Sequence, residues 1–317
     1  MTGSTMPSPV RQADERGCDE MPGMSTSTAA SRSERFAQLH AHGCLVVPNP
    51  WDAGSARLLE IMGFEALAST GAGLAFSQGR ADLATPLTDK LAYLQALCHA
   101  TGLPVTADLE DCGPTHDHIA HTIACAVQAG VAGVSIEDTT GERSRPIRDK
   151  LEAAERVQVA AQAAKAGPHR VMLTARADNY FYGIQNLGDT IERLQAYQEA
   201  GADVLFAPGL RTREDIRAVL SSVDRPVNVL MGFPGVDITL DELRDMGVRR
   251  VSVGGVLARV AYSAMMRAAQ DILQQGSFDC AGGAIAGPLL NRLFGDERLG
   301  SAERQQLLAE QFLEKRP

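Results

Sequence analysis

The stretch PVTADLEDCGPTHD, residues 104–117, places three carboxylates directly after a short apolar run. Asp108, Glu110 and Asp111 stand where a buried strand should end, and a Gly-Pro pair then turns the chain. Acidic side chains in this position either cap the following helix or hold a ligand. The choice depends on where the strand end lies and on which other side chains reach it.

The elements that must position these residues form a repeat of strand, then helix. Most of the apolar runs are continuous, as in parallel strands that are buried on both faces. Amphipathic stretches separate them, and several end in Gly. Eight such units predict an α/β fold, a (β/α)₈ TIM-type barrel. A doubly wound open sheet is the alternative, but no dinucleotide GxGxxG occurs. The strands are predicted at 44–50, 67–71, 104–110, 133–138, 171–178, 203–209, 227–232 and 250–255.

Side chains at the carboxyl ends of barrel strands point into one mouth, where active sites lie. Asp108 and Glu110 follow the third strand, and Glu137 follows the fourth. Carboxylates that meet there repel one another or take up protons, unless a cation lies between them. A donor set made only of oxygens indicates Mg²⁺ or Mn²⁺ rather than Zn²⁺. For Asp111 and Asp138, taken singly, a helix-capping role is favoured.

Arg176, at the end of the fifth strand, suits a planar anion because its fork can bind a carboxylate or phosphate through two hydrogen bonds. Thr70, Gly71 and Ala72 follow the second strand and offer backbone N–H groups to a second anion, although a tight turn explains them equally well. With a metal, Arg176 would stabilise an enolate, the charge that forms when a bond next to a carbonyl breaks.

Several other residue types argue against competing chemistries. The four lysines lie away from the predicted strand ends, which disfavours a Schiff-base aldolase. They are Lys90, Lys150, Lys165 and Lys315. The group His116, His118 and His121 has ligand-like spacing, but a solvated helix face is favoured. Cys112 lies close to the third strand end, on a loop that makes it a weak candidate for a catalytic thiol.

Composition excludes several classes of partner. The 317 residues carry a formal net charge of −9 and no basic run, so nucleic acid is not an expected partner. No apolar run approaches the ~20 residues that a membrane span needs. The six cysteines form no CxxC pair, which favours free thiols and a cytoplasmic location.

The two ends differ from the repeat. Residues 1–33 are polar and rich in Ser, Thr, Gly and Pro, which predicts a disordered tail before a barrel over 34–276. Met24 is an alternative start to Met1. Residues 277–317 form a helical extension that exceeds what a barrel requires. We expect it to pack on a neighbouring subunit of a homo-oligomer.

Over about residues 34–290 the chain resembles the isocitrate lyase/phosphoenolpyruvate mutase superfamily. The resemblance rests on PNPWDAGSARLLEIMGFEALASTGAGLAFSQGRADL, PVTADLED, GVSIED, LTARAD and AGADVLFAPG, in that order. It implies a Mg²⁺-dependent barrel enzyme that breaks or forms C–C or P–C bonds in small 2-oxo or 2-hydroxy acids. It also implies a tetramer with an exchanged terminal helix.

The same resemblance implies roles for individual residues. The metal would be held, directly or through water, by Asp108 and Glu110, with Glu137 as the glutamate of the fourth strand. Asp82 matches a further acid after the second strand. Arg176 matches the arginine of the fifth strand, and the substrate-carboxylate turn falls on Thr70, Gly71 and Ala72.

One loop departs from the superfamily pattern. Isocitrate and methylisocitrate lyases carry a Cys-Gly-His loop after the fourth strand, whereas this chain reads EDTTGERSRPIRDK over 137–150. The Lys and Asn of phosphoenolpyruvate mutases are absent from it as well. The acid or base is left open, with Glu142, Arg143 and Arg145 on this loop as candidates.

These observations favour a Mg²⁺-dependent lyase that cleaves a C–C bond in a small 2-oxo or 2-hydroxy carboxylic acid through a metal-stabilised enolate. A phosphonomutase or phosphonate hydrolase is the second hypothesis, because the Gly-rich VSVGGV after the eighth strand lies where barrels often hold phosphate. A binding protein without turnover is the third.

Overall fold

The computed structural model describes residues 25–295 and 300–313, and it confirms the predicted barrel. Eight parallel strands pair in the order β1-β8-β7-β6-β5-β4-β3-β2. Ala68 N donates to Pro48 O at 3.0 Å, which joins the first strand to the second. The strands are β1 Leu45–Val47, β2 Leu67–Ala68, β3 Val105–Asp108, β4 Gly133–Glu137, β5 Met172–Arg176, β6 Val204–Phe206, β7 Val227–Leu230 and β8 Arg250–Ser252.

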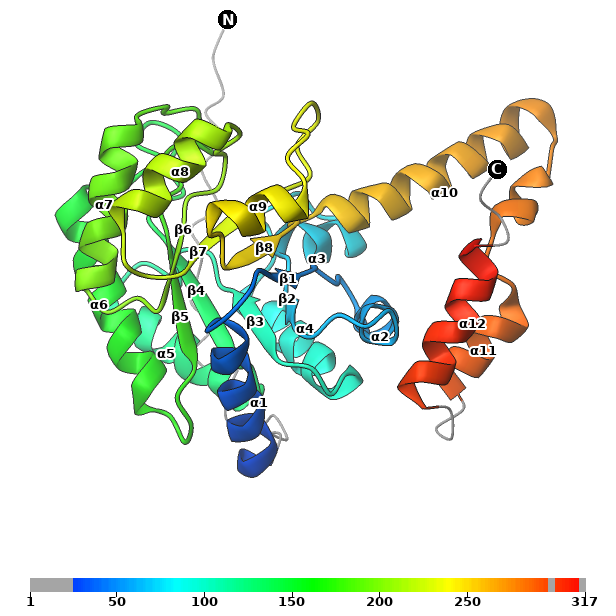
Figure 1. Ribbon diagram of the computed structural model, residues 1–317, viewed down its shortest axis with the longest axis horizontal. Coiled ribbons are helices and arrows are strands. Elements are labelled where there is room, and N and C mark those ends of the chain that lie inside the picture. Colours follow the sequence, from blue (N-terminus) through cyan, green and yellow to red (C-terminus); the bar gives the residue numbers. More distant parts are fainter. Residues whose placement is uncertain (1–24, 296–299, 314–317) are drawn as a thin grey trace, which may run out of the picture.

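Helices surround the strands, and three further helices lie outside the repeat (Figure 1). The helices that follow the strands are α2 Ala53–Ile61, α3 Gly71–Ser77, α4 Leu87–Ala100, α5 His116–Gln128, α6 Lys150–Ala166, α7 Leu187–Glu199, α8 Arg213–Ser222, α9 Leu240–Met246 and α10 Val256–Gln275. The additional helices are α1 Thr26–Leu39, α11 Gly287–Gly295 and α12 Ser301–Leu313, together with a 3₁₀ turn at Asp279–Gly283.

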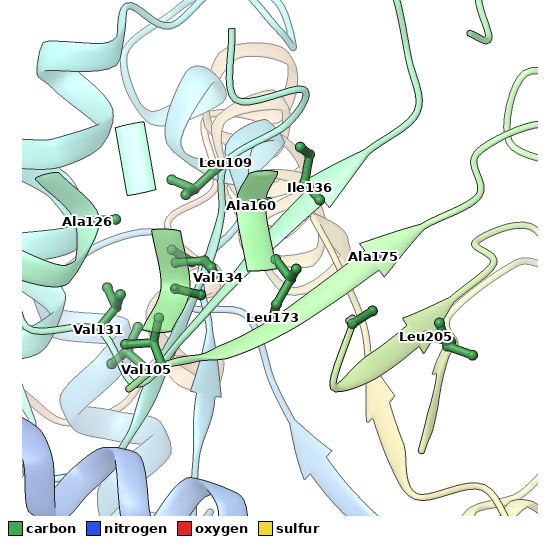
Figure 2. Close-up of a cluster of buried hydrophobic side chains, with 14 of the residues drawn as sticks. Val105, Leu109, Ala126, Val131, Val134, Ile136, Ala160, Leu173, Ala175 and Leu205 are labelled. Atoms are coloured by element: carbon green, nitrogen blue, oxygen red, sulfur yellow. The ribbon is translucent and has the colours of Figure 1, made fainter. Parts of the chain in front are cut away.

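The main core lies between the strands and the helices rather than inside the barrel (Figure 2). Alternate residues of β4 and β5 point outward, and they pack against Ala126 of α5 and Ala160 of α6. The inward positions between them are polar, among them Ser135 and Thr174. This alternation differs from the continuous apolar burial that was predicted, and it leaves the barrel interior polar below the site.

Helix α1 covers the amino-terminal end of the barrel. Phe36 is fully buried in a small cluster with residues of β1 and β2. Arg32 donates to the carbonyl oxygens of Cys98 and Thr101, at 2.7 Å each. Ser25 caps the helix by accepting from Thr28 N. Residues 26–33 are therefore helical, so the expected boundary of the disordered tail at 33 is wrong, while Met1 and Met24 lie outside the described residues.

The carboxyl-terminal helices extend away from the barrel and then return to its side. Helix α10 projects outward (Figure 1), and Ala258 is its one buried residue. Ile61 of α2 forms a small buried cluster with Leu293 of α11 and Leu308 of α12. Within this single chain the extension thus contacts the chain's own α2, and its exchange between subunits stays a prediction.

Two further expectations concern the chain as a whole. Within 25–295 and 300–313, no helix is both long and apolar enough to cross a membrane. Cys44, Cys98, Cys112 and Cys280 are free thiols. Cys125 is disulfide-bonded, so the prediction of free thiols is wrong for that residue.

Candidate active site

A cavity of about 260 Å³ opens at the carboxyl ends of the strands. This is the end at which (β/α)₈ barrels carry their active sites. The structure brings all the predicted site residues to its wall, although their individual roles stay predictions. They are Thr70, Gly71, Ala72, Asp82, Asp108, Glu110, Glu137 and Arg176.

Arg176 lies at the centre of the site and binds three carboxylates. Its Nη1 donates to Asp108 Oδ1 at 3.0 Å, and its Nη2 lies 3.0 Å from Glu137 Oε2. Nε and Nη2 also donate to the two oxygens of Asp178, at 3.1 and 2.7 Å. A guanidinium has five N–H donors, of which three donate hydrogen bonds here, and Nη2 also makes an ion pair with Glu137. Arg176 is therefore not free to grip a planar anion with both arms, as the sequence had suggested.

Burial shifts the pKa values of these groups. Desolvation by burial raises the pKa of Glu137 well above its usual range, although Arg176 opposes the shift. Burial likewise raises the pKa of Asp178. Burial alone would lower the pKa of Arg176, but Asp178, Glu137 and Asp108 together raise it well above its ordinary value. The arginine is thus held charged by acids that partly resist ionisation.

Glu110 has a cationic partner that the sequence did not reveal. Lys90, on the first turn of α4, places Nζ 2.7 Å from Glu110 Oε1, and both side chains are more than 90% buried. Glu110 itself has a φ of 54°, a left-handed conformation that turns its side chain back toward the strand end. Lysine does reach the site, but it stands behind Glu110 and does not line the cavity.

The acidic cluster consists of five carboxylates, those of Asp82, Asp108, Glu110, Glu137 and Asp178. A metal ion is not the only cation that reduces their mutual repulsion, because Arg176 and Lys90 already supply two positive charges. Negative charge nevertheless remains in excess.

The residues present fit Mg²⁺ on the chemistry of the donors. Within the described residues no three acidic, His or Cys side chains form a ready-made metal cluster. Mg²⁺ does not require one, since it keeps several waters and binds through one or two carboxylates. Asp108 Oδ1 faces Arg176, whereas Oδ2 lies on the cavity side, 3.8 Å from where a Cβ on Gly71 would be. Glu110 Oε1 lies 3.4 Å from the same point.

The predicted anion turn is the start of a helix. Thr70 caps α3, and its Oγ1 accepts from Gly73 N at 3.1 Å. Thr70 N donates to the hydroxyl of Tyr93, which in turn donates to Pro50 O. Thr70 is thus fixed from both sides. The N–H groups of Gly71 and Ala72 belong to the first helical turn, where the helix itself provides no acceptor.

Asp82 lies on the loop after α3, at the rim of the cavity. Desolvation by burial raises its pKa, and the nearby charges of Asp108 and Glu110 raise it further. Its Oδ1 accepts from Leu83 N at 3.0 Å. Asp82 is therefore electrostatically coupled to the acidic cluster.

Comparison with known proteins identifies the family. The family model for phosphoenolpyruvate phosphomutase matches residues 36–273, which include all eight strands and the whole acidic cluster. The chain belongs to the phosphoenolpyruvate phosphomutase family. It is a member of the isocitrate lyase/phosphoenolpyruvate mutase superfamily, as the resemblance implied.

Three known proteins are similar to this chain over most of its length. A 2-methylisocitrate lyase from Halalkalibacterium halodurans is 30% identical over 251 residues, 77% of this chain and 83% of the relative. A structure from Burkholderia cenocepacia J2315, provisionally named a lyase/mutase, is 46% identical with a TM-score of 0.83, and covers 86% of this chain and 98% of that chain. An oxaloacetate acetylhydrolase, solved with its product oxalate, is 25% identical with a TM-score of 0.76, covering 84% and 95%.

The loop after β4 folds back on itself. Thr139 and Ile147 form an antiparallel bridge, and Arg148 Nε donates to Thr139 O at 3.0 Å. Arg145 pairs with Glu152 at the surface. The candidate residues Glu142, Arg143 and Arg145 do not line the cavity.

Apolar side chains from other loops form the outer wall of the cavity instead. Phe181 and Tyr182 follow β5, and Met231 and Phe233 follow β7. Leu83 joins them from the loop that carries Asp82. None of these five residues was among the predicted site residues. The signal was present as the aromatic segments NYFYG and MGFPG, directly after two predicted strands.

Several acidic and reactive residues have structural roles. The helix-capping role favoured for Asp111 and Asp138 is wrong, because Thr115 caps α5 and Asp149 caps α6. Asp111 pairs with Arg148, at 3.5 Å. Asp138 accepts hydrogen bonds from Tyr197, Arg193 and the backbone of Asp178. Cys112 is buried outside the cavity wall, and burial raises its thiol pKa well above the usual range.

Proposed function

We propose that this protein is a Mg²⁺-dependent lyase that cleaves a C–C bond in a small 2-oxo or 2-hydroxy carboxylic acid. The observation that carries the proposal is the acidic cluster organised by Arg176 inside a closed barrel mouth. The relatives support it, because a 2-methylisocitrate lyase and an oxaloacetate acetylhydrolase share this fold at 25–30% identity.

In this proposal Asp108, Glu110 and Glu137 would hold the ion, directly or through water. When bound, the ion would supply Lewis-acid stabilisation of the negative charge that forms on the substrate oxygen. Arg176 fixes the orientation of Asp108 and Glu137, and Lys90 fixes Glu110. The chain thus holds its ligands in place before substrate arrives, which lowers the cost of reorganisation.

The substrate carboxylate binds to the backbone N–H groups of Gly71 and Ala72, with Thr70 holding the turn. The remaining N–H of Arg176 Nη1 provides one further donor. Asp82, whose pKa is raised, exchanges a proton with the reacting carbon at the rim. The outer wall of Phe181 and its neighbours receives the hydrocarbon part of the acid and excludes water from the charged centre.

One observation weighs against P–C bond chemistry by a phosphonomutase or phosphonate hydrolase. Val253 N and Gly254 N, in the Gly-rich loop after β8, both donate to Asn49 Oδ1, at 2.9 and 2.8 Å. These amides are occupied within the chain, so they do not form the phosphate cradle that the sequence suggested. The family model's name still makes phosphonopyruvate a necessary member of the substrate panel.

The test is a substrate panel with and without Mg²⁺. Malate-type acids, alkyl-substituted malates, oxaloacetate and phosphonopyruvate are incubated with the protein, and release of pyruvate, glyoxylate or oxalate is measured. We expect Mg²⁺-dependent C–C cleavage that Asp108→Asn abolishes and Asp111→Asn, a control outside the cavity, retains. Turnover of phosphonopyruvate alone would establish the second hypothesis. Saturable binding without turnover would establish a binding protein.

We also propose that a second copy of this chain covers α10, giving a homo-oligomer (dimer or tetramer). Four large apolar side chains of this helix are 58–86% exposed, those of Val260, Met265, Met266 and Leu273. Exposed apolar patches of this kind commonly mark protein–protein interfaces. Light scattering coupled to size exclusion at micromolar concentration tests this. A monomer would contradict it.

A further inference from the structure

A buried arginine occupies the interior of the barrel below the acidic cluster. Arg250, the first residue of β8, is 4% exposed. Its Nε donates to Asn228 Oδ1 on β7, and its Nη2 donates to Thr174 Oγ1 on β5, at 2.9 Å each. Since β5 lies across the barrel from β8, the guanidinium lies inside the barrel rather than against its own strand. Its Nη1 is buried and has no hydrogen-bond partner in the part of the chain that the structure describes.

The charge of Arg250 has no counter-ion in residues 25–295 and 300–313. No carboxylate there lies within ion-pair distance of it, although Arg148, Arg176 and Arg193 all have such partners. Burial lowers the pKa of Arg250 to about 9, which still leaves it charged at neutral pH. An unpaired buried charge is costly, and buried charges in proteins are normally paired.

His40, a titratable group that is influenced by this charge, does not neutralise it. His40, at the end of α1, has its pKa lowered to about 4 by burial and by the charge of Arg250. It is neutral at pH 7, with Nδ1 against Phe36 O at 2.7 Å. His40 therefore brings no negative charge to the guanidinium.

Arg250 lines the same cavity that opens at the acidic cluster. Its floor also carries Thr106, Thr174, Asn228 and Ser252, and it contains no carboxylate. Asn228 Nδ2 donates to Ser252 Oγ at 2.9 Å, which fixes the amide so that its oxygen faces Arg250. The floor is thus rich in donors and positive, whereas the mouth is negative.

We propose that Arg250 forms an anion subsite at the floor of the cavity, which takes one small monovalent anion, a carboxylate group or a halide. The Arg250 guanidinium supplies the positive charge, and the hydroxyls of Thr106 and Thr174 supply neutral donors. Two sources provide this chemistry, a free halide and the second carboxylate of a dicarboxylic substrate. The proposal does not rest on the lyase activity.

Thermal unfolding of the whole protein tests it without any turnover. Sodium bromide replaces sodium isethionate at constant ionic strength, because isethionate is too bulky for the floor. We expect Tm to rise with the logarithm of the bromide concentration once this exceeds the Kd, by about 2 °C at about ten times the Kd. Arg250→Met should lose this dependence, and Arg249→Met should retain it, since Arg249 is exposed and only its Nη1 contacts Gly43 O.

An anomalous difference map from wild-type crystals grown in bromide gives a readout that needs no variant, and the expected peak lies on the cavity side of the Arg250 guanidinium. If bromide competes with malate but not with the shorter glycolate, the subsite belongs to a dicarboxylic substrate. If bromide binds without competing, the subsite is one for inorganic anions. A Tm that is equal in bromide and isethionate, with no peak at Arg250, overturns the proposal whatever the enzyme's activity.

Discussion

The buried pair of Lys90 and Glu110 allows a sharp prediction, made for the metal-free protein. Lys90→Met keeps the length and apolar stem of the side chain and removes its charge. Glu110 then remains 5% exposed beside Asp108 without the cation that lies 2.7 Å away. Removing one partner of a buried ion pair costs about 3–5 kcal/mol, because the other charge stays desolvated.

The expected change in Tm follows from the size of the chain. Unfolding entropy is roughly 2.1 cal/mol/K per residue, which gives roughly 0.6 kcal/mol/K for a chain of this length. A loss of about 3–5 kcal/mol then lowers Tm by about 5–8 °C. Calorimetry in EDTA, with urea unfolding as a second probe, measures it.

Two further variants make this result interpretable. Lys150→Met removes the same charge from an exposed pair with Glu192, and we expect a loss of about 0–1 kcal/mol. The double variant Lys90→Met/Glu110→Gln should recover much of the lost stability, since no charge is left stranded. If Lys90→Met is as stable as Lys150→Met, or if the double variant is no better than the single one, the reasoning is refuted.

Four other outcomes are expected. Asp108→Asn should abolish Mg²⁺-dependent turnover, measured by product release, and should raise the apo Tm because it relieves repulsion in the acidic cluster. Arg176→Lys should lower kcat at least 10²-fold with intact far-UV circular dichroism, because Lys cannot bridge three carboxylates. Burial raises the pKa of Asp138 from 3.8 to about 6, so ionisation opposes folding. The unfolding free energy of Asp138→Asn relative to wild type should therefore increase by about 2 kcal/mol as pH rises from about 4 to about 6, measured by urea titrations. Met266→Glu/Leu273→Glu should dissociate the oligomer on size exclusion.

The fold was predictable from the sequence because its signals are local. Each strand of the structure lies within one of the predicted ranges. The strand-end acids were found for the same reason, since barrel topology converts a position in a strand into a position at the mouth. The helical part of the supposed tail was missed because α1 buries only three residues, Ala29, Ser33 and Phe36, in an otherwise largely polar segment.

What the sequence did not reveal depends on long-range contacts. Lys90 reaches Glu110 from a helix twenty residues earlier, and no spacing rule marks such a pair. The polar barrel interior was missed because the strands were treated as uniformly apolar. The inward residues Thr106, Ser135 and Thr174 each lie between two apolar residues and two positions before a charged strand-end residue. This alternation of polar and apolar residues could have indicated the polar interior. Arg250 and Ser252 show the same alternation on β8.

The count of N–H donors changes the role of the central arginine. Arg176 was expected to grip substrate through both arms, but three of its five donors make hydrogen bonds to Asp108 and Asp178, and Nη2 also pairs with Glu137. Its main effect is to fix carboxylates, so most of the attraction for a substrate anion must come from other groups. The N–H groups of Gly71 and Ala72 and the charge of Arg250, which has no ion-pair partner in the described residues, are the groups of the cavity that can supply it. A substrate with two carboxylates, one at each, would satisfy both and leave its reacting carbon beside the acidic cluster.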